Sequence, residues 1–242
     1  MREASISIVI AVYEMPAALE EALKSIIEQA DVAWEVILCD GGNDVETLDL
    51  VAHYSQHPIR HLRQPDAGVY DAMNRGIAAS KGNWVYFLGA DDRLAHPHAL
   101  FNLLSAANDT CSLVCGKVHN LTPRAKGVPE YHSPQWSSAL LFKNTVHHQG
   151  CIYRREHVKH YRYPDDLKVL GDYHLNLWLY QQRFSTICTN NLVAHCEPGG
   201  LSKRFNRSLY REEWRLKSRL LPRLHLVWLP FWLMSKYLYK QL

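Results

Sequence analysis

The sequence lacks the motifs that mark several large classes of enzyme. GxGxxG does not follow the first apolar segment, and GxxxxGK[ST] occurs nowhere. The glycine-rich phosphate cradles of dinucleotide-binding and P-loop proteins therefore have no residues to form them. The six cysteines include no CxxC pair, which argues against a disulfide framework or a zinc site and indicates reduced thiols. No window holds 18 uninterrupted apolar residues, so we expect no transmembrane span.

The N-terminus and the charge distribution set further bounds. Glu3 precedes the short apolar run at residues 6–12, and no small-residue cleavage site follows, so we expect a buried strand there and no signal peptide. The formal net charge is +3, but residues 203–242 hold ten Lys or Arg and only two Glu. We therefore expect a mildly acidic body, residues 1–202, followed by a basic tail that binds a partner.

Apolar and amphipathic segments alternate along the body. Short apolar runs predict strands at residues 5–12, 34–39, 59–62, 84–88 and 112–118. Segments with helical periodicity or helix signals lie at residues 17–30, 44–54, 69–80 and 100–107. Strands separated by single helices predict an α/β domain with a mostly parallel sheet and helices on both faces.

Acidic turns follow two of the predicted strands. Asp40-Gly41-Gly42 comes after the second strand, and Asp91-Asp92 comes after the strand at residues 84–88. Ligands of open α/β sheets bind at the carboxyl ends of the strands. Paired carboxylates there suit Mg²⁺, which proteins hold with one or two carboxylates plus substrate phosphates. This pattern points to nucleotide-sugar chemistry; the alternative is that Asp91 and Asp92 only cap the next helix.

Seven ordered segments resemble the family 2 glycosyltransferases of the GT-A fold, particularly bacterial enzymes that assemble O-antigen, capsule or colanic-acid repeat units. The DGG segment alone is weak evidence for this family, whereas the long segment at residues 64–82 followed by GADD is specific to it. The resemblance extends over roughly residues 5–202. Its segments are SIVIAVYE (7–14), DGG (40–42), QPDAGVYDAMNRGIAASKG (64–82), GADD (89–92), HHQGCIYRRE (147–156), LGDYHLNLWL (170–179) and GGLS (199–202).

The resemblance implies an inverting, metal-dependent transfer of a sugar from a nucleotide-diphospho sugar, most simply a UDP-linked one, on a Rossmann-like GT-A domain. It also implies a donor half, about residues 1–118, and an acceptor half, about residues 119–202. Asp92, with Asp91, would hold Mn²⁺ or Mg²⁺. The donor-binding residues would be Asp40, Gly41, Asp66, Tyr70, Asp71, Asn74 and Asp91.

Asp172 falls where the family keeps its catalytic base. It would take the proton of the acceptor hydroxyl, and a single base without a second carboxylate nearby favours inversion. The alternative is that Asp172 is the N-cap of the helix predicted at residues 173–182. His148 and Gln149 would line the acceptor or sugar pocket, with core packing as the alternative. A loop over the diphosphate, or else a plain turn, would contain Gly199, Gly200 and Ser202.

The tail predicts a basic amphipathic helix at residues 210–221 and an apolar, aromatic-rich run at residues 224–234 that Pro230 interrupts. Aromatic side chains beside Lys and Arg are typical of a helix lying on an anionic leaflet. We therefore expect a peripheral cytoplasmic protein whose residues 210–240 contact the inner face of the cytoplasmic membrane, where a polyprenyl-diphosphate-linked saccharide would be the acceptor. In the alternative, the tail docks on the catalytic domain or on a second subunit of a homodimer. We expect no nucleic-acid partner, because the basic residues come without a recognition motif.

Two other functions compete with sugar transfer. A nucleotidyltransferase on a related α/β fold would need a triphosphate-binding loop after the first strand, and the sequence has none there. A saccharide-binding scaffold at the membrane surface, without catalysis, would not need Asp40, Asp91, Asp92 and Asp172 together.

Overall fold

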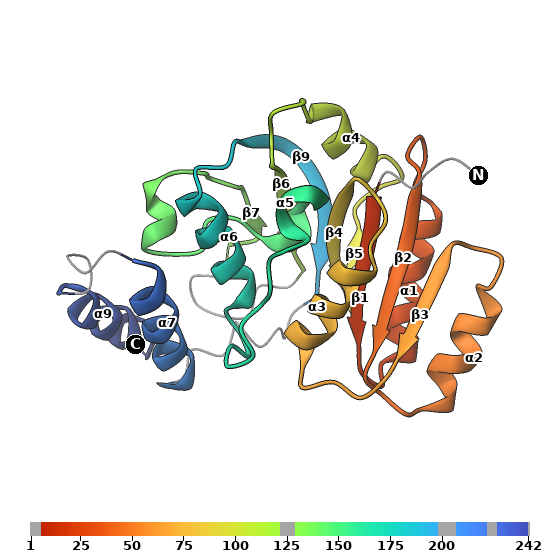
Figure 1. The fold of residues 1–242 in the computed structure, drawn as a ribbon, viewed down its shortest axis with the longest axis horizontal. Helices are drawn as coiled ribbons and strands as arrows, with labels where there is room; N and C mark the ends of the chain where they lie inside the picture. Colours follow the sequence, from red (N-terminus) through yellow and green to blue (C-terminus); the bar gives the residue numbers. More distant parts are fainter. Residues whose placement is uncertain (1–5, 122–128, 198–206, 222–226, 242) are drawn as a thin grey trace.

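The computed structural model describes residues 6–121, 129–197, 207–221 and 227–241 (Figure 1). Within these residues, nine strands form one sheet. The strands are β1 (Ile6–Val12), β2 (Trp34–Asp40), β3 (Ile59–Arg63), β4 (Trp84–Gly89), β5 (Arg93–Leu94), β6 (Leu113–Asn120), β7 (Tyr131–His132), β8 (Cys151–Arg154) and β9 (Thr186–Cys196). Their order is β3-β2-β1-β4-β8-β6-β9-β5, with β7 added beside β6.

Helices connect and cover these strands. The helices are α1 (Pro16–Ile27), α2 (Val45–His53), α3 (Val69–Ala79), α4 (Ala99–Ala106), α5 (Arg155–Val158), α6 (Gly171–Gln181), α7 (Arg207–Leu220) and α9 (Leu229–Gln241). Two short 3₁₀ turns, η1 (Ser138–Leu141) and η2 (His148–Gly150), precede β8. In Figure 1, α3 crosses in front of the central strands and α1 lies behind them.

The direction of the strands confirms the expected class. β1, β2, β3 and β4 are parallel neighbours, and β6 and β9 run parallel to each other. Because β8 is antiparallel to both β4 and β6, those two strands run in the same direction. The protein is therefore an α/β fold with a mostly parallel sheet. The strand β6 crosses the predicted boundary near residue 118, so the donor and acceptor halves share one sheet and their division stays a prediction.

The alternation of side chains along β1 shows why both faces of the sheet are covered. Ile8 and Ile10 belong to a buried cluster shared with α1, and Val9 belongs to the opposite cluster, shared with α3 and α6. The helix α3 lies very close to β1 at Gly76, where a Cβ atom would be 2.2 Å from Val9 Cγ1. A continuous apolar run therefore indicates a strand buried on two sides.

The C-terminal region differs from expectation in one respect. The strand β9 was not predicted, because its eleven residues are mostly half-buried and include Asn190-Asn191. Pro230, which interrupts the predicted apolar run, lies in the first turn of α9, where proline needs no hydrogen-bond donor. Of the described helices, none combines the length and the apolar character needed to cross a bilayer.

The helix α7 is docked on the body by buried polar contacts. Glu213 forms ion pairs with Lys217 at 2.8 Å and with Lys236 of α9 at 2.7 Å. Lys217 Nζ also donates to the carbonyl oxygen of Phe142 at 2.7 Å, and the Lys217 side chain is fully buried. On the surface, Arg219 pairs with both carboxylate oxygens of Asp166 at 2.8 Å. The alternative, in which the tail packs on the catalytic domain, therefore holds for α7.

One buried histidine of α6 makes stability depend on pH. His174 is 9% exposed, and its Nδ1 lies 2.7 Å from the Tyr161 hydroxyl. Burial, with a smaller contribution from the positive charge of Arg219, lowers the pKa of His174 to about 4. Protonation of this imidazole is therefore much easier in the unfolded chain, where its pKa is about 6.5.

We expect the free energy of unfolding to fall as the pH falls from about 6.5 to 4, because the unfolded chain binds a proton that the folded His174 resists. This group contributes a loss of about 2 to 3 kcal/mol over that range. Urea unfolding at a series of pH values would show a shallower slope for His174→Gln than for the wild type. Equal slopes of unfolding free energy against pH in the two proteins would contradict the low pKa of His174.

Candidate active site

A cavity of about 220 Å³ lies at the carboxyl end of β4, between η2 and the start of α6. It brings together six of the predicted site residues: Tyr70, Asp91, Asp92, His148, Gln149 and Asp172. These residues come from segments far apart in the chain. The other lining residues are Val69, Met73, Gly89, His147, Lys168, Val169, Cys196 and Glu197.

Asp92 is folded back against the end of β4 and buried. A Cβ atom at Gly89 would lie 2.3 Å from Asp92 Oδ2, so the turn requires glycine there. Asp92 Oδ1 accepts the backbone N–H of Glu197 at 3.0 Å, and Oδ2 accepts the side-chain amide of Gln149. Burial first, and the charge of Asp91 second, raise the pKa of Asp92 to about 6.

The pair Asp91-Asp92 fits a divalent cation. Asp91 is exposed and Asp92 is 5% exposed, and both carboxylates line the cavity. Burial and, second, the negative charge of Asp91 raise the pKa of Asp92, and a bound cation would offset both effects. Among the described residues, no group of three His, Cys, Asp or Glu side chains is arranged to hold a metal. Substrate phosphates would have to complete the coordination, as is usual for Mg²⁺. The helix-cap alternative is wrong, because α4 begins after His98 and has no side-chain cap.

Asp172 lies in the first turn of α6. The residue at the N-cap position is Leu170, and no side chain caps the helix, so the N-cap alternative for Asp172 is wrong. Asp172 Oδ2 accepts a hydrogen bond from Asn144 Nδ2 at 3.1 Å and lies 3.6 Å from His148 Nδ1. Both contacts leave the other carboxylate oxygen, Oδ1, without a described protein partner.

Asn144 is a site residue that the sequence analysis missed. Its side-chain oxygen accepts from Asn176 Nδ2 at 3.2 Å, and Tyr153 donates to the side-chain oxygen of Asn176 at 3.1 Å. A chain of hydrogen bonds therefore orients the amide that holds Asp172. The only local signal was the position of Asn144 three residues before the HHQ motif.

Tyr70 supports the start of α6. Its hydroxyl donates to the carbonyl oxygen of Val169 at 2.7 Å. Burial and the charge of Asp172 raise the pKa of Tyr70, and the backbone N–H groups of Gly171 and Asp172 act in the opposite direction. A Cβ atom at Gly171 would lie 2.5 Å from the Tyr70 ring, so this contact also requires glycine. Tyr70 thus packs beneath Asp172 and also lines the cavity.

His148 and Gln149 lie between the two acidic positions. Gln149 Nε2 donates to Asp92, while its side-chain oxygen is buried and has no hydrogen-bond partner within the described residues. His148 faces Asp172. Both side chains line the cavity, so polar atoms remain for a substrate, and the predicted sugar or acceptor pocket stays a prediction with this support.

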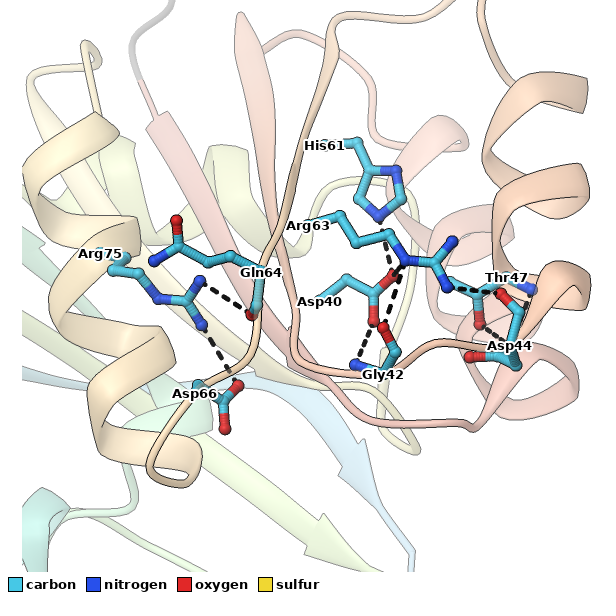
Figure 2. Close-up of polar contacts among 9 residues, drawn as sticks. All are labelled: Asp40, Gly42, Asp44, Thr47, His61, Arg63, Gln64, Asp66 and Arg75. Atoms are coloured by element: carbon cyan, nitrogen blue, oxygen red, sulfur yellow. Dashed lines mark hydrogen bonds and ion pairs between the residues drawn. The ribbon is translucent and has the colours of Figure 1, made fainter.

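The predicted base-binding residue Asp40 does not line this cavity. Figure 2 shows its carboxylate enclosed: Oδ1 accepts the N–H of Gly42 at 2.8 Å, and Oδ2 lies 3.0 Å from His61 Nε2 and 3.7 Å from Arg63 Nε. The side chain has no exposed surface. In this conformation Asp40 orders the Asp-Gly-Gly turn; direct contact with a donor base stays a prediction and would require the carboxylate to be uncovered.

The Asp40-Gly41-Gly42 turn contacts the turn at Asp66 through Gly41. A Cβ atom there would lie 2.3 Å from Asp66 Oδ2, and the same oxygen pairs with Arg75 Nη2 at 3.2 Å (Figure 2). The conformation of the second turn is therefore tied to the first. Donor binding by Gly41 and Asp66 stays a prediction.

Asp71 and Asn74 lie outside the main cavity. Both functions of the Asn74 amide bind the backbone of Tyr163, at 2.8 and 3.1 Å, which fastens the segment before α6 to α3. Asp71 accepts the N–H of Ala67 at 3.3 Å and lines a smaller neighbouring cavity of about 190 Å³. Their predicted contacts with the donor remain untested by this geometry. The predicted loop residues Gly199, Gly200 and Ser202 lie outside the described residues.

Comparison with known proteins assigns this site to a family. The family described as Glycosyl transferase family 2 matches residues 7–162. The chain belongs to glycosyl transferase family 2. Membership of this family favours sugar transfer over nucleotidyl transfer as the reaction to propose. The match ends before Asp172 and before α7.

Relatives agree with this family. A PGL/p-HBAD biosynthesis glycosyltransferase from Mycobacterium bovis (strain BCG / Pasteur 1173P2) is 35% identical over 159 residues, covering 62% of this chain and 59% of that protein. The O-antigen biosynthesis protein RfbC of Myxococcus xanthus is 31% identical over 162 residues, covering 64% of this chain and 13% of its own. This family 2 chain thus spans about three fifths of the length of the mycobacterial relative.

A solved structure confirms the GT-A fold. S. aureus TarS 1–349 in complex with UDP-GlcNAc aligns with a TM-score of 0.72 over 97% of this chain and 71% of TarS. At 16% identity, this likeness shows the fold alone.

The contact between Gln149 and Asp92 makes a testable prediction. Gln149→Leu removes a hydrogen-bond donor from a buried carboxylate, so the pKa of Asp92 should rise from about 6 by roughly one unit. Carbon-13 NMR titration of labelled Asp carboxyls would measure it, with the signal identified by its loss in Asp92→Asn. Gln182→Leu, at a residue that does not line the cavity, is the control; an unchanged Asp92 pKa in Gln149→Leu would contradict the contact.

Proposed function

We propose that this chain transfers a sugar, with inversion and with a divalent metal, from a UDP-linked donor to a polyprenyl-diphosphate-linked saccharide during cell-surface polysaccharide assembly. One observation carries the proposal: Asp172 shares a cavity with the pair Asp91-Asp92. Carboxylates at separate positions can serve the leaving group and the attacking group of a single displacement.

The acidic pair serves the leaving group. A glycosyl donor releases a nucleoside diphosphate, on which negative charge increases in the transition state. Asp92 and Asp91 would hold Mn²⁺ or Mg²⁺, which supplies neutralisation of that charge when bound. Gln149 and the N–H of Glu197 keep the Asp92 carboxylate in place for this task.

Asp172 serves the acceptor. Asn144 and His148 both contact Oδ2, so Oδ1 is the oxygen left to take the proton of the attacking hydroxyl. The acceptor oxygen then forms the new glycosidic bond as the bond to the diphosphate breaks. The other carboxylate that lines the cavity is Glu197, whose Oε1 lies 3.7 Å from Arg93 Nη1. The proposal gives Glu197 no part in the displacement, which is direct and inverts the anomeric carbon.

Asp172→Asn tests this role. We expect transfer to fall by at least about 10²-fold, because the amide cannot accept the proton, while binding of the UDP-sugar is retained. Turnover and calorimetric donor binding should be measured on the same preparation. Asp165→Asn is the matched control, since Asp165 is an exposed carboxylate seven positions earlier. Full activity of Asp172→Asn would reject Asp172 as the base, whereas a wild-type protein without turnover would favour a non-catalytic scaffold.

The tail supports a membrane surface as the site of the acceptor. Its two acids, Glu212 and Glu213, are buried, whereas Arg207, Arg211 and Arg215 are exposed at a spacing of one helical turn on α7. These three arginines line an apolar hollow of about 650 Å³ between α7 and α9. The two acids thus face inward and these three arginines outward, which complements an anionic lipid surface.

Exposed apolar side chains in α9 and just before it fit the same partner. Trp228, Phe231 and Met234 are 73%, 70% and 60% exposed, respectively. Aromatic groups beside a basic row are typical of helices that lie at the inner leaflet. We therefore place the protein peripherally on the inner face of the cytoplasmic membrane, where a lipid-linked acceptor is available.

Vesicle sedimentation tests the membrane surface. Phe231→Ser should weaken binding to vesicles containing anionic lipid by several-fold, because an apolar contact is lost. Leu48→Ser, at an exposed leucine of α2, is the control and should not change binding. Deletion of residues 222–242 should move the protein from the pellet to the supernatant. Unchanged sedimentation of these variants would contradict contact with the membrane. A wild-type dimer that dissociates in Phe231→Ser would instead indicate a subunit interface.

A further inference from the structure

The segment just before Asp172 is held by a carboxylate from the C-terminal tail. Glu212 Oε1 accepts three successive backbone N–H groups, those of Lys168, Val169 and Leu170, at 3.0, 2.8 and 2.7 Å. The Glu212 side chain belongs to α7 and its residue is 5% exposed.

The contact has a clear physical basis. Backbone N–H groups at the start of a helix have no partner within the helix and favour a negative charge. Three N–H groups that converge on one oxygen form an anion-binding nest. The Tyr70 hydroxyl donates to the carbonyl oxygen of Val169, in the same segment, at 2.7 Å. Two side chains from other elements thus hold the backbone through which Asp172 is oriented.

We propose that Glu212 is a positioning residue for sugar transfer: it acts through the backbone of residues 168–170 to aim Asp172 at the acceptor. The proposal rests on the proposed function, in which Asp172 is the base. It also gives α7 a role in the active site besides any contact with lipid, although α7 lies outside the matched family region.

Other contacts keep α7 in place when Glu212 is changed. Lys217 Nζ donates to the carbonyl oxygen of Phe142, and Arg219 pairs with Asp166, and neither contact involves residues 168–170. A substitution of Glu212 therefore alters the nest while the helix stays docked. Arg219→Gln is the matched control, since it breaks a contact of the same helix with the same connecting segment.

The experiment compares Glu212→Ala, Glu212→Gln and Arg219→Gln in the full chain, with the UDP-sugar that the wild type transfers. Misplacement of the base should lower kcat for Glu212→Ala by roughly 10- to 100-fold, with donor KM within about twofold of wild type. Glu212→Gln keeps an acceptor oxygen and should recover part of kcat. Amide hydrogen exchange at residues 168–170 should be faster in Glu212→Ala and unchanged in Arg219→Gln.

Each outcome is decisive. Wild-type kcat in Glu212→Ala, or unchanged amide exchange at residues 168–170, would overturn the role of Glu212. Equal losses of kcat in Glu212→Ala and Arg219→Gln would also overturn it, since they would indicate general loosening of α7. If the wild type transfers no sugar, the proposed function fails; if it does and Glu212→Ala matches it, only the role of Glu212 fails.

Discussion

The constraint on which the rest of the site depends is the fixed direction of α6 at its first turn. Asp172 is presented there by contacts from three separate parts of the chain: Tyr70 of α3, Asn144 before η2 and Glu212 of α7. A carboxylate held through both its backbone and its side chain has a defined orientation, which proton transfer to a general base requires. In the proposed mechanism, α7 is therefore one of the elements that position the base.

The sheet positions the acidic pair Asp91-Asp92 and the residues of η2 that contact it. The strand β8 lies between β4 and β6 and runs against both, so η2, which precedes it, lies beside the end of β4. That reversal brings Gln149 to Asp92 and His148 to Asp172. Two residues adjacent in the sequence thus connect the carboxylate that would hold a metal with the carboxylate that would accept a proton.

The sequence predicted the parts of the fold that local pattern controls. The strands β1, β2 and β4 were visible as apolar runs because both of their faces are buried, whereas β9 has a half-exposed, polar centre and resembled a loop. Asp91 and Asp92 were found from their position at the end of a predicted strand, and Asp172 through the resemblance to a family. Asn144 and Glu212 were not, because their roles depend on partners distant in the chain. The enclosure of Asp40 by His61 depends on a tertiary contact between β2 and β3 in the same way.

The most direct measurement of the central claim is a thermal-shift panel of UDP-, GDP- and dTDP-sugars with and without Mn²⁺. A ligand at a hundred times its Kd stabilises the native state by about 2.7 kcal/mol. For a chain of this length, that is a rise in Tm of roughly 5 to 10 °C. We predict such a rise for a UDP-sugar with Mn²⁺, much reduced without the metal and in Asp92→Asn. A panel in which no nucleotide sugar changes the Tm would contradict the account.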